Sequence, residues 1–95
     1  TVLKRATAEY PLYQPQNGWA EQHPEDWWQA VKTTIRHVMA GEDPASVVGI
    51  GLSGQMHGAV LLDAKNQALR PAILWCDART GAECDEINRL VGKER

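Results

Sequence analysis

Apolar residues recur at helical spacing in the stretch 24–41, which is the clearest pattern in the chain. The residues that lie three or four positions apart are Trp27, Val31, Ile35 and Val38. This spacing predicts a helix with one apolar face. Pro24 suits the first helical position, where its missing N–H costs no hydrogen bond, and Gly41 is typical of a helix end. The pattern therefore predicts a helix from Pro24 to about Gly41.

Four shorter stretches have the composition of strands. Residues 2–10 alternate loosely between apolar and polar, which predicts an edge or antiparallel strand. Residues 47–52 are continuously apolar and include two glycines, a pattern typical of a strand covered on both faces. Residues 59–62 and 72–75 predict two further strands, and the polar residues at 63–67 predict a turn between them.

A second helix is predicted from Ala78 or Thr80 to about Val91. Its start has two candidate caps, which are Asp77 itself or Thr80 paired with Glu83 in a capping box. The residues that this helix is expected to bury are Cys84, Ile87 and Val91.

The mixture of helices and strands indicates an α/β or α+β class. Residues 11–22 contain prolines, an asparagine and a glycine, so they predict a loop. A chain of 95 residues with 43% hydrophobic and 23% charged residues is expected to form one domain, or a piece of one, around one modest core. Because Thr1 is not an initiator methionine, we expect the chain to be a segment of a longer protein.

Charge and cysteine content exclude several partners. The net charge is −2 and the 10 Lys and Arg residues are scattered, so no nucleic-acid footprint is expected. No apolar run approaches the roughly 20 residues that a membrane span needs, so no membrane partner is expected. Cys76 and Cys84 are too few for a disulfide framework and predict thiols in a reducing cytoplasm.

Three motif-like strings fail on their context. Residues 49–54 match G-x-G-x-x-G, but a strand-like stretch follows where a dinucleotide site needs a helix. Around Ser53 the chain has Gln55 where a nucleophile elbow needs glycine. The three histidines lack the spacing of metal ligands, so no metal bound by these residues is expected.

The turn Gln55-Met-His-Gly58 is the strongest candidate for ligand contact. Gly54 and Gly58 let a ligand approach the backbone closely, and side chains at strand ends commonly face ligands. The alternative is that His57 is satisfied by backbone groups at a strand end. Trp75 is either core or a pocket wall. Asp77 and Arg79 either contact a ligand or cap the helix and pair with each other, and we favour the second alternative.

Three blocks together carry a family resemblance: residues 18–28 (GWAEQHPEDWW), 50–58 (IGLSGQMHG) and 69–79 (LRPAILWCDAR). In this order they resemble the amino-terminal domain of the carbohydrate kinases that include xylulokinase, glycerol kinase and gluconokinase, usually called the FGGY family. The Gln-Met-His-Gly form is most similar to the bacterial xylulokinase branch.

The resemblance implies a partial ribonuclease-H-like, actin-like domain of the α/β class, with a mixed sheet and two main helices. Residues 1–95 would be part of the sugar-binding amino-terminal domain. The phosphate-binding hairpin and the aspartate base would lie outside them, as would the carboxy-terminal domain that binds ATP and Mg²⁺. The resemblance thus implies no catalytic residue in this segment and no cofactor bound by it alone.

The resemblance also implies the substrate contacts. Met56 and His57 would contact the sugar, with Gln55 beside them, and Trp75 would lie against the polyol. The expected partner is D-xylulose in a cytoplasmic enzyme, with a homodimer as the expected assembly. Two alternatives stay open, which are a kinase of another polyol or sugar acid and a non-catalytic interaction domain.

Overall fold

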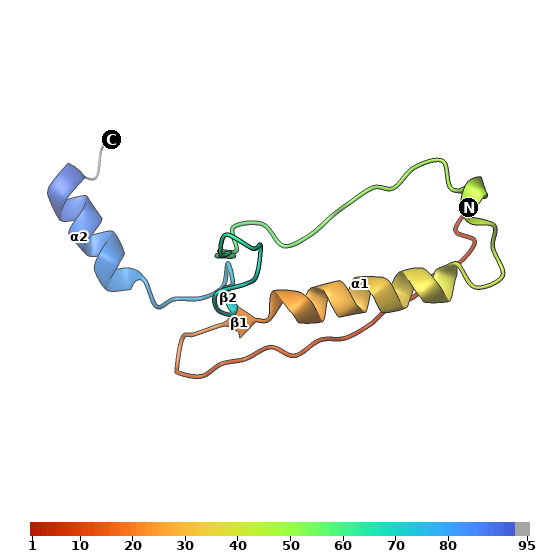
Figure 1. Ribbon diagram of the computed structural model, residues 1–95. Coiled ribbons are helices and arrows are strands. Elements are labelled where there is room, and N and C mark those ends of the chain that lie inside the picture. The colour runs from red at the N-terminus through yellow and green to blue at the C-terminus, as the bar shows by residue number, and fades with distance from the viewer. Residues whose placement is uncertain (93–95) are drawn as a thin grey trace.

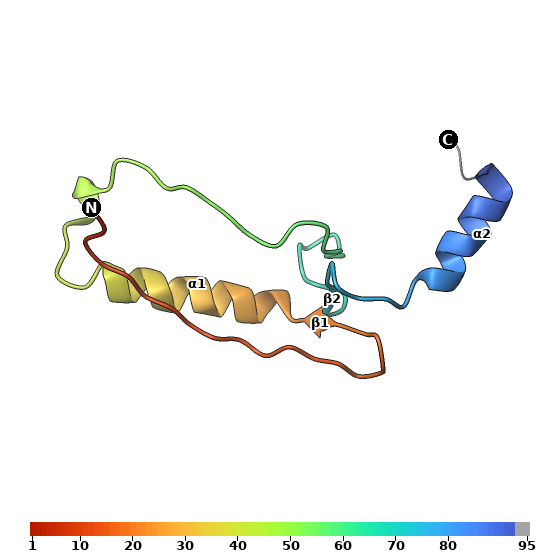
Figure 2. The same cartoon turned by 180° about the vertical axis from the view of Figure 1, so that it is seen from behind.

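The computed structural model describes residues 1–92 and contains two helices and two short strands. The helices are α1 (Pro24–Val38) and α2 (Gly81–Val91), and a short 3-10 helix, η1 (Pro44–Ser46), follows α1. The strands β1 (Glu21–Gln22) and β2 (Ala72–Ile73) pair antiparallel at the start of α1 (Figure 1). Helix α2 projects away from the other helix and from the two strands, both in this view and when the molecule is seen from behind (Figure 2).

Two single-residue pairings widen this small sheet. Tyr13 pairs with Glu21 on one side, and Ala59 pairs with Ile73 on the other. Because Glu21 is opposite Ile73, four neighbouring segments lie in a row at this level. Every one of these pairings is antiparallel, so the mixed sheet expected from the resemblance is not formed among the residues described.

Helix α1 confirms the strongest pattern in the sequence. It begins at Pro24, as predicted, but ends at Val38, before the predicted end near Gly41. Gly41 adopts φ 76°, a left-handed conformation that favours glycine, in the turn that follows. The predicted apolar face is only partly covered, since Trp27 is half-buried and Ile35 is 49% exposed.

Two of the four strand predictions, those for residues 2–10 and 47–52, are wrong. Residues 2–10 and 47–52 are extended but form no strand with any of the residues described, and Val48 and Leu52 are fully exposed. Both segments run lengthwise beside α1 (Figures 1 and 2). A strand needs a neighbouring backbone to receive its hydrogen bonds, and the described part of the chain brings none to these two segments.

The remaining strand predictions are confirmed in part. The stretch 59–62 is reduced to single pairings, including Leu62 with Ala68, and 72–75 is shortened to β2. The predicted turn at 63–67 is confirmed, because the Asp63 carboxylate accepts the backbone N–H groups of Lys65 and Gln67. Strand β1 lies inside the stretch that was predicted as a loop.

Helix α2 differs from its prediction in start and in burial. It begins at Gly81, so Thr80 is confirmed as the N-cap residue, but its side chain makes no capping bond, and Asp77 as the cap is wrong. The Asp77 carboxylate is occupied elsewhere, by the backbone N–H of Ala20 and by Arg79. The residues predicted to be buried are all exposed, namely Cys84, Ile87 and Val91, because α2 projects away from the sheet.

The core is smaller than the composition predicted. Its buried apolar residues are Ala20, Ala72 and Leu74. The surface area is 8304 Å², whereas a compact monomer of this mass would expose about 5,400 Å². The chain therefore packs closely only around β1 and β2, and polar contacts carry much of that arrangement.

Replacing Ala72 with leucine should destabilise the protein, because the Ala72 side chain is 0% exposed and has no room to grow. Overpacking of this kind costs about 1–3 kcal/mol of unfolding free energy. The matched control is Ala64→Leu at an exposed turn position, where a change within about 0.5 kcal/mol is expected. Urea unfolding measures both, and equal losses would contradict the assignment of the core.

Candidate functional site

Strand β1 carries two buried polar side chains that serve opposite faces. Glu21 and Gln22 are each 7% exposed. Successive side chains of a strand point to opposite faces, and the hydrogen bonds follow this rule. Glu21 contacts arginines that flank β2, whereas Gln22 contacts Trp27 of α1 and Gln55 of the predicted ligand turn.

The first face holds an ion cluster of Glu21, Arg70, Asp77 and Arg79, called the Glu21 cluster below. Glu21 Oε1 accepts from Arg70 Nη2 at 2.6 Å and from Arg79 Nη1 at 2.8 Å. Arg79 also donates two hydrogen bonds to the Asp77 carboxylate, from Nε to Oδ1 at 2.8 Å and from Nη2 to Oδ2 at 2.6 Å. A bidentate arginine–carboxylate pair of this kind fixes the relative orientation of the two side chains as well as neutralising their charges.

Further contacts lock the cluster to the backbone and to an aromatic ring. Asp77 Oδ2 accepts the backbone N–H of Ala20 at 2.6 Å, just before β1. The guanidinium carbon of Arg79 lies 3.7 Å from the centre of the Trp19 ring, a cation–π contact. The pairing of Asp77 with Arg79 confirms that half of the favoured interpretation, whereas their capping of α2 is wrong, because its N-cap is Thr80.

The cluster stays ionised near neutral pH. The hydrogen bond from Arg79 lowers the pKa of Glu21 against the opposing effect of burial, and the charges of Arg79 and Arg70 add to it. Hydrogen bonds from Arg79, Ala20 and the Arg79 backbone hold the pKa of Asp77 well below its usual range, and Asp77 in turn raises the pKa of Arg79. Carboxylates held ionised in this way are poor proton acceptors. The role of the cluster is therefore structural: it acts as a clamp that holds β1 against the segments before and after β2.

On the second face, Gln22 binds the turn that sequence analysis singled out. Gln22 Oε1 accepts from Trp27 Nε1 at 3.0 Å and from Gln55 Nε2 at 3.1 Å. Beyond Gln55, Met56 is 74% exposed and His57 is exposed with φ 62°. The left-handed conformation of His57 turns the chain sharply, which is uncommon for a residue other than glycine.

The sheet register carries the turn and Trp75 to the same end of β2. Ala59 and Ile73 exchange two backbone hydrogen bonds, at 2.8 and 3.2 Å. In an antiparallel pair, the residues just before Ala59 and just after Ile73 lie at the same end of the pairing. His57 there is left-handed, and Trp75 lies in a turn closed by the bond from the Asp77 N–H to the Leu74 carbonyl. Trp75 is 64% exposed. The turn and Trp75 thus start from the same end of this pairing, and the alternative of Trp75 as core is wrong for the residues described.

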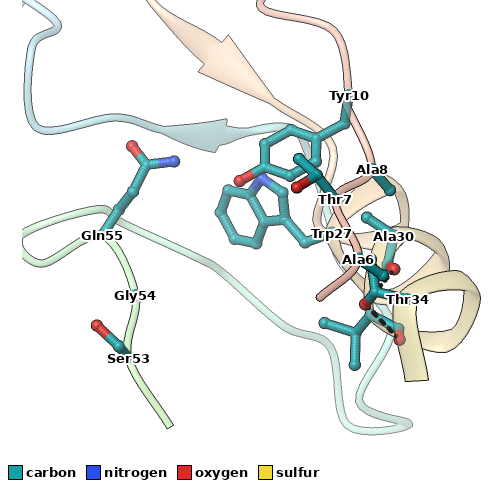
Figure 3. A pocket seen from close by; sticks show the side chains of 11 residues that line it. Ala6, Thr7, Ala8, Tyr10, Trp27, Ala30, Thr34, Ser53, Gly54 and Gln55 are labelled. Atoms are coloured by element: carbon teal, nitrogen blue, oxygen red, sulfur yellow. Dashed lines mark hydrogen bonds between the residues drawn. The ribbon is translucent and has the colours of Figure 1, made fainter. Parts of the chain in front are cut away.

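A cavity of about 540 Å³ lies beside this edge (Figure 3). Residues of the amino-terminal segment, of α1 and of the stretch 53–55 line it. Gln55 is part of its wall, whereas Met56, His57 and Trp75 are not among its lining residues. The structure therefore joins Gln55 to a cavity and leaves the other three predicted contacts on the neighbouring open surface.

Within residues 1–92, the His, Cys, Asp and Glu side chains form no group of three suited to a metal ion. Over the same range, the helices are too short or too polar to cross a membrane. Neither Cys76 nor Cys84 is in a disulfide.

Sequence reasoning missed Glu21, Gln22 and Arg70. All three lie in the blocks that carry the family resemblance, at 18–28 and 69–79. The periodicity of the sequence gives no signal for Glu21 and Gln22, because a two-residue strand is too short to show alternation.

Comparison with known proteins gives this arrangement a family. Residues 1–95 match the N-terminal domain of the FGGY family of carbohydrate kinases. The chain belongs to the FGGY family. This confirms the resemblance inferred from the three sequence blocks.

Two curated relatives illustrate the similarity of this FGGY chain to xylulose kinases. It is 42% identical over 94 residues to the xylulose kinase of Klebsiella pneumoniae, covering 99% of this chain and 20% of that protein. The xylulose kinase of Escherichia coli K12 is 39% identical, with 99% and 19% covered. The chain thus spans about a fifth of the length of these relatives.

Solved structures of FGGY relatives agree in shape. A Brucella ovis protein titled a xyloylose kinase matches with a TM-score of 0.77 and 45% identity, over 85% of this chain and 18% of that one. Gluconate kinase from Lactobacillus acidophilus matches with a TM-score of 0.79 and 26% identity, over 90% and 17%. The elongated conformation of this chain is therefore one that such proteins adopt over a small part of their length.

Replacing Arg79 with leucine should lower the melting temperature strongly at pH 7, because Glu21 and Asp77 would become buried carboxylates without their main partner. The loss should be several times that of the control Arg89→Leu, whose exposed pair with Glu86 contributes little.

The loss should also shrink in acid. Both carboxyl pKa values are lowered in the folded state, so their stabilisation is present above about pH 4.5 and declines as the pH falls towards the lowered values. Calorimetric melting at pH 7 and pH 3 measures both effects. A loss no greater than that of the control at pH 7 would contradict the clamp.

Proposed function

We propose that this FGGY chain is the sugar-binding part of the amino-terminal domain of a longer kinase that phosphorylates D-xylulose with ATP. The family match over residues 1–95 and the similarity to proteins named xylulose kinase support it. The observation that carries it is the shared edge: the Gln55–His57 turn and Trp75 leave the sheet at the same end of β2.

The side chains at this edge have complementary roles in the proposal. His57 donates or accepts one hydrogen bond with a sugar hydroxyl, while Met56 and Trp75 supply apolar surface to the carbon face. Met56 and Trp75 are both more than half exposed, so their surfaces are open to a ligand. A site that pairs sugar hydroxyls selects strongly, because a wrong sugar leaves polar groups without partners.

The chemical step belongs to other parts of the proposed enzyme. Phosphoryl transfer needs the acceptor oxygen, the metal and the γ-phosphate held together. ATP and Mg²⁺ are assigned to the remainder of the longer protein, in a ribonuclease-H-like arrangement of two domains. Here Glu21 and Asp77 are committed to arginines, so neither is offered as the catalytic base.

A second substrate class stays open, which is another polyol or a sugar acid. The Lactobacillus acidophilus gluconate kinase and a xylulose kinase from the same organism match this chain with the same TM-score of 0.79 and 26% identity, so the likeness in shape does not choose between these substrates. Measuring ADP release by the full-length protein with D-xylulose, gluconate and glycerol separates the two. Turnover of gluconate and not of xylulose would replace the substrate while keeping the reaction.

In the full-length protein, His57→Ala should raise KM for D-xylulose by about tenfold, the factor that corresponds to loss of one good hydrogen bond. The control is His37→Ala, an exposed histidine in the last turn of α1, which should leave KM unchanged. Steady-state kinetics with varied xylulose measures both. Unaltered kinetics for His57→Ala would remove His57 from the sugar contacts, and absence of xylulose turnover in the original protein would favour the non-catalytic interaction domain.

The chain of residues 1–95 by itself should not phosphorylate D-xylulose. Only part of the acceptor site is assigned to it, and positioning of the γ-phosphate and metal supplies most of the catalysis in phosphoryl transfer. A coupled ADP assay on the isolated chain, with the full-length protein as control, measures this. ATP-dependent turnover by the isolated chain would contradict the division of labour proposed here.

A further inference from the structure

The side-chain oxygen of Gln22 joins two segments that are distant in the sequence. It accepts one hydrogen bond from Trp27 Nε1 in the first turns of α1 and one from Gln55 Nε2 in the turn. An amide oxygen offers two lone pairs, so these donors use its full capacity. Gln22 is 7% exposed, which keeps competing water away from the junction.

The indole of Trp27 fixes which way both amides face. Its Nε1–H can only donate, so the Gln22 atom that meets it must be the oxygen. The Gln55 atom that meets the same oxygen must then be the amide nitrogen. Figure 3 shows this orientation, with the Gln55 nitrogen turned towards Trp27 and its oxygen turned away. Gln55 is therefore left with an acceptor, Oε1, for another partner.

We propose that Gln22 is a positioning residue that holds the Gln55–His57 turn in place and presents Gln55 Oε1 as an acceptor for a sugar hydroxyl. The proposal rests on the proposed sugar kinase function and adds a selectivity element to it. Every sugar hydroxyl can donate one hydrogen bond. An acceptor whose direction is already fixed binds that hydroxyl with less loss of side-chain entropy.

Strand β1 gives Gln22 the rigidity that this role requires. Its backbone pairs with Ala72, which is fully buried. The preceding residue, Glu21, is held by Arg79 and Arg70. The turn is fixed on its other side by the pairing of Ala59 with Ile73. The side chain of Gln55 is tied to β1 by its bond to Gln22, and through Gln22 to Trp27 of α1.

The test compares Gln22→Met with Gln29→Met in the full-length protein. Methionine keeps the length of the side chain but removes the acceptor, and Gln29 is an exposed residue of α1 that bonds only locally, to Glu25. Gln22→Met should raise KM for D-xylulose about tenfold, as expected for one lost hydrogen bond, and should leave KM for ATP unchanged. Gln29→Met should change neither. An unchanged sugar KM, or an equal rise in both KM values, would overturn the proposal.

A double-mutant cycle with Gln55→Met separates positioning from general destabilisation. If Gln22 acts through Gln55, adding Gln22→Met to Gln55→Met should raise the sugar KM no further. Additive effects would mean that Gln22 acts on the site by another route.

Amide hydrogen exchange gives a readout that does not depend on activity. Gln22→Met should speed exchange of the Ala59 amide, which adjoins the turn and donates to Ile73 O at 2.8 Å, relative to Gln29→Met, because the turn loses its side-chain anchor. If Gln22→Met fails to fold, Gln55→Met removes the same hydrogen bond from its donor side and should also speed that exchange. Unchanged exchange would overturn the positioning role. Absence of sugar turnover in the original protein would overturn only the proposed function.

Discussion

The two-sided anchoring of β1 is the constraint on which the described structure depends. Glu21 is held by arginines on one face, and Gln22 is held by Trp27 and Gln55 on the other. Burying a carboxylate is unfavourable unless it is paired and hydrogen-bonded, and Arg79 meets this condition for Glu21 and Asp77 together. Since the buried apolar residues are two alanines and a leucine, these polar contacts fix where the segments meet.

This anchoring links parts of the chain that the candidate site needs together. Asp77 follows Trp75 closely and is tied through Arg79 to β1. Gln55 is the first residue of the turn that carries His57. Its side chain is hydrogen-bonded to Gln22, the residue of β1 that follows Glu21. A strand of two residues can do this because its consecutive side chains point in opposite directions. The clamp and the turn therefore share one rigid reference element, and neither needs a large core to stay in place.

The division between charged and apolar side chains fits a binding role better than an acid–base role. The carboxylates nearest the site are kept ionised by arginine. Under the proposed function, the exposed side chains Met56, His57 and Trp75 are the ones assigned to the mixed polar and apolar surface of a sugar. FGGY relatives with known structures share the conformation over 85–90% of this chain. Its exposed apolar segments are thus compatible with a place inside a larger fold.

Sequence alone determined the features that depend on near neighbours. Pro24 and the apolar spacing gave the start and course of α1, Asp63 gave its turn through bonds to residues two and four positions on, and the glycines around Gln55-Met-His marked a turn. Such elements are stabilised by contacts within a few residues, so local residue types suffice to predict them.

Tertiary structure decided the strands, the start of α2 and the partners of Glu21 and Gln22. Residues 47–52 have strand composition but form no strand with the residues described, whereas Glu21 and Gln22 lie in a predicted loop and form β1. Asp77, a plausible helix cap by position, instead accepts from Ala20 and Arg79. The reason is that strand pairing and buried charge pairing depend on segments distant in the sequence, and no local pattern of residues records which distant segment will arrive.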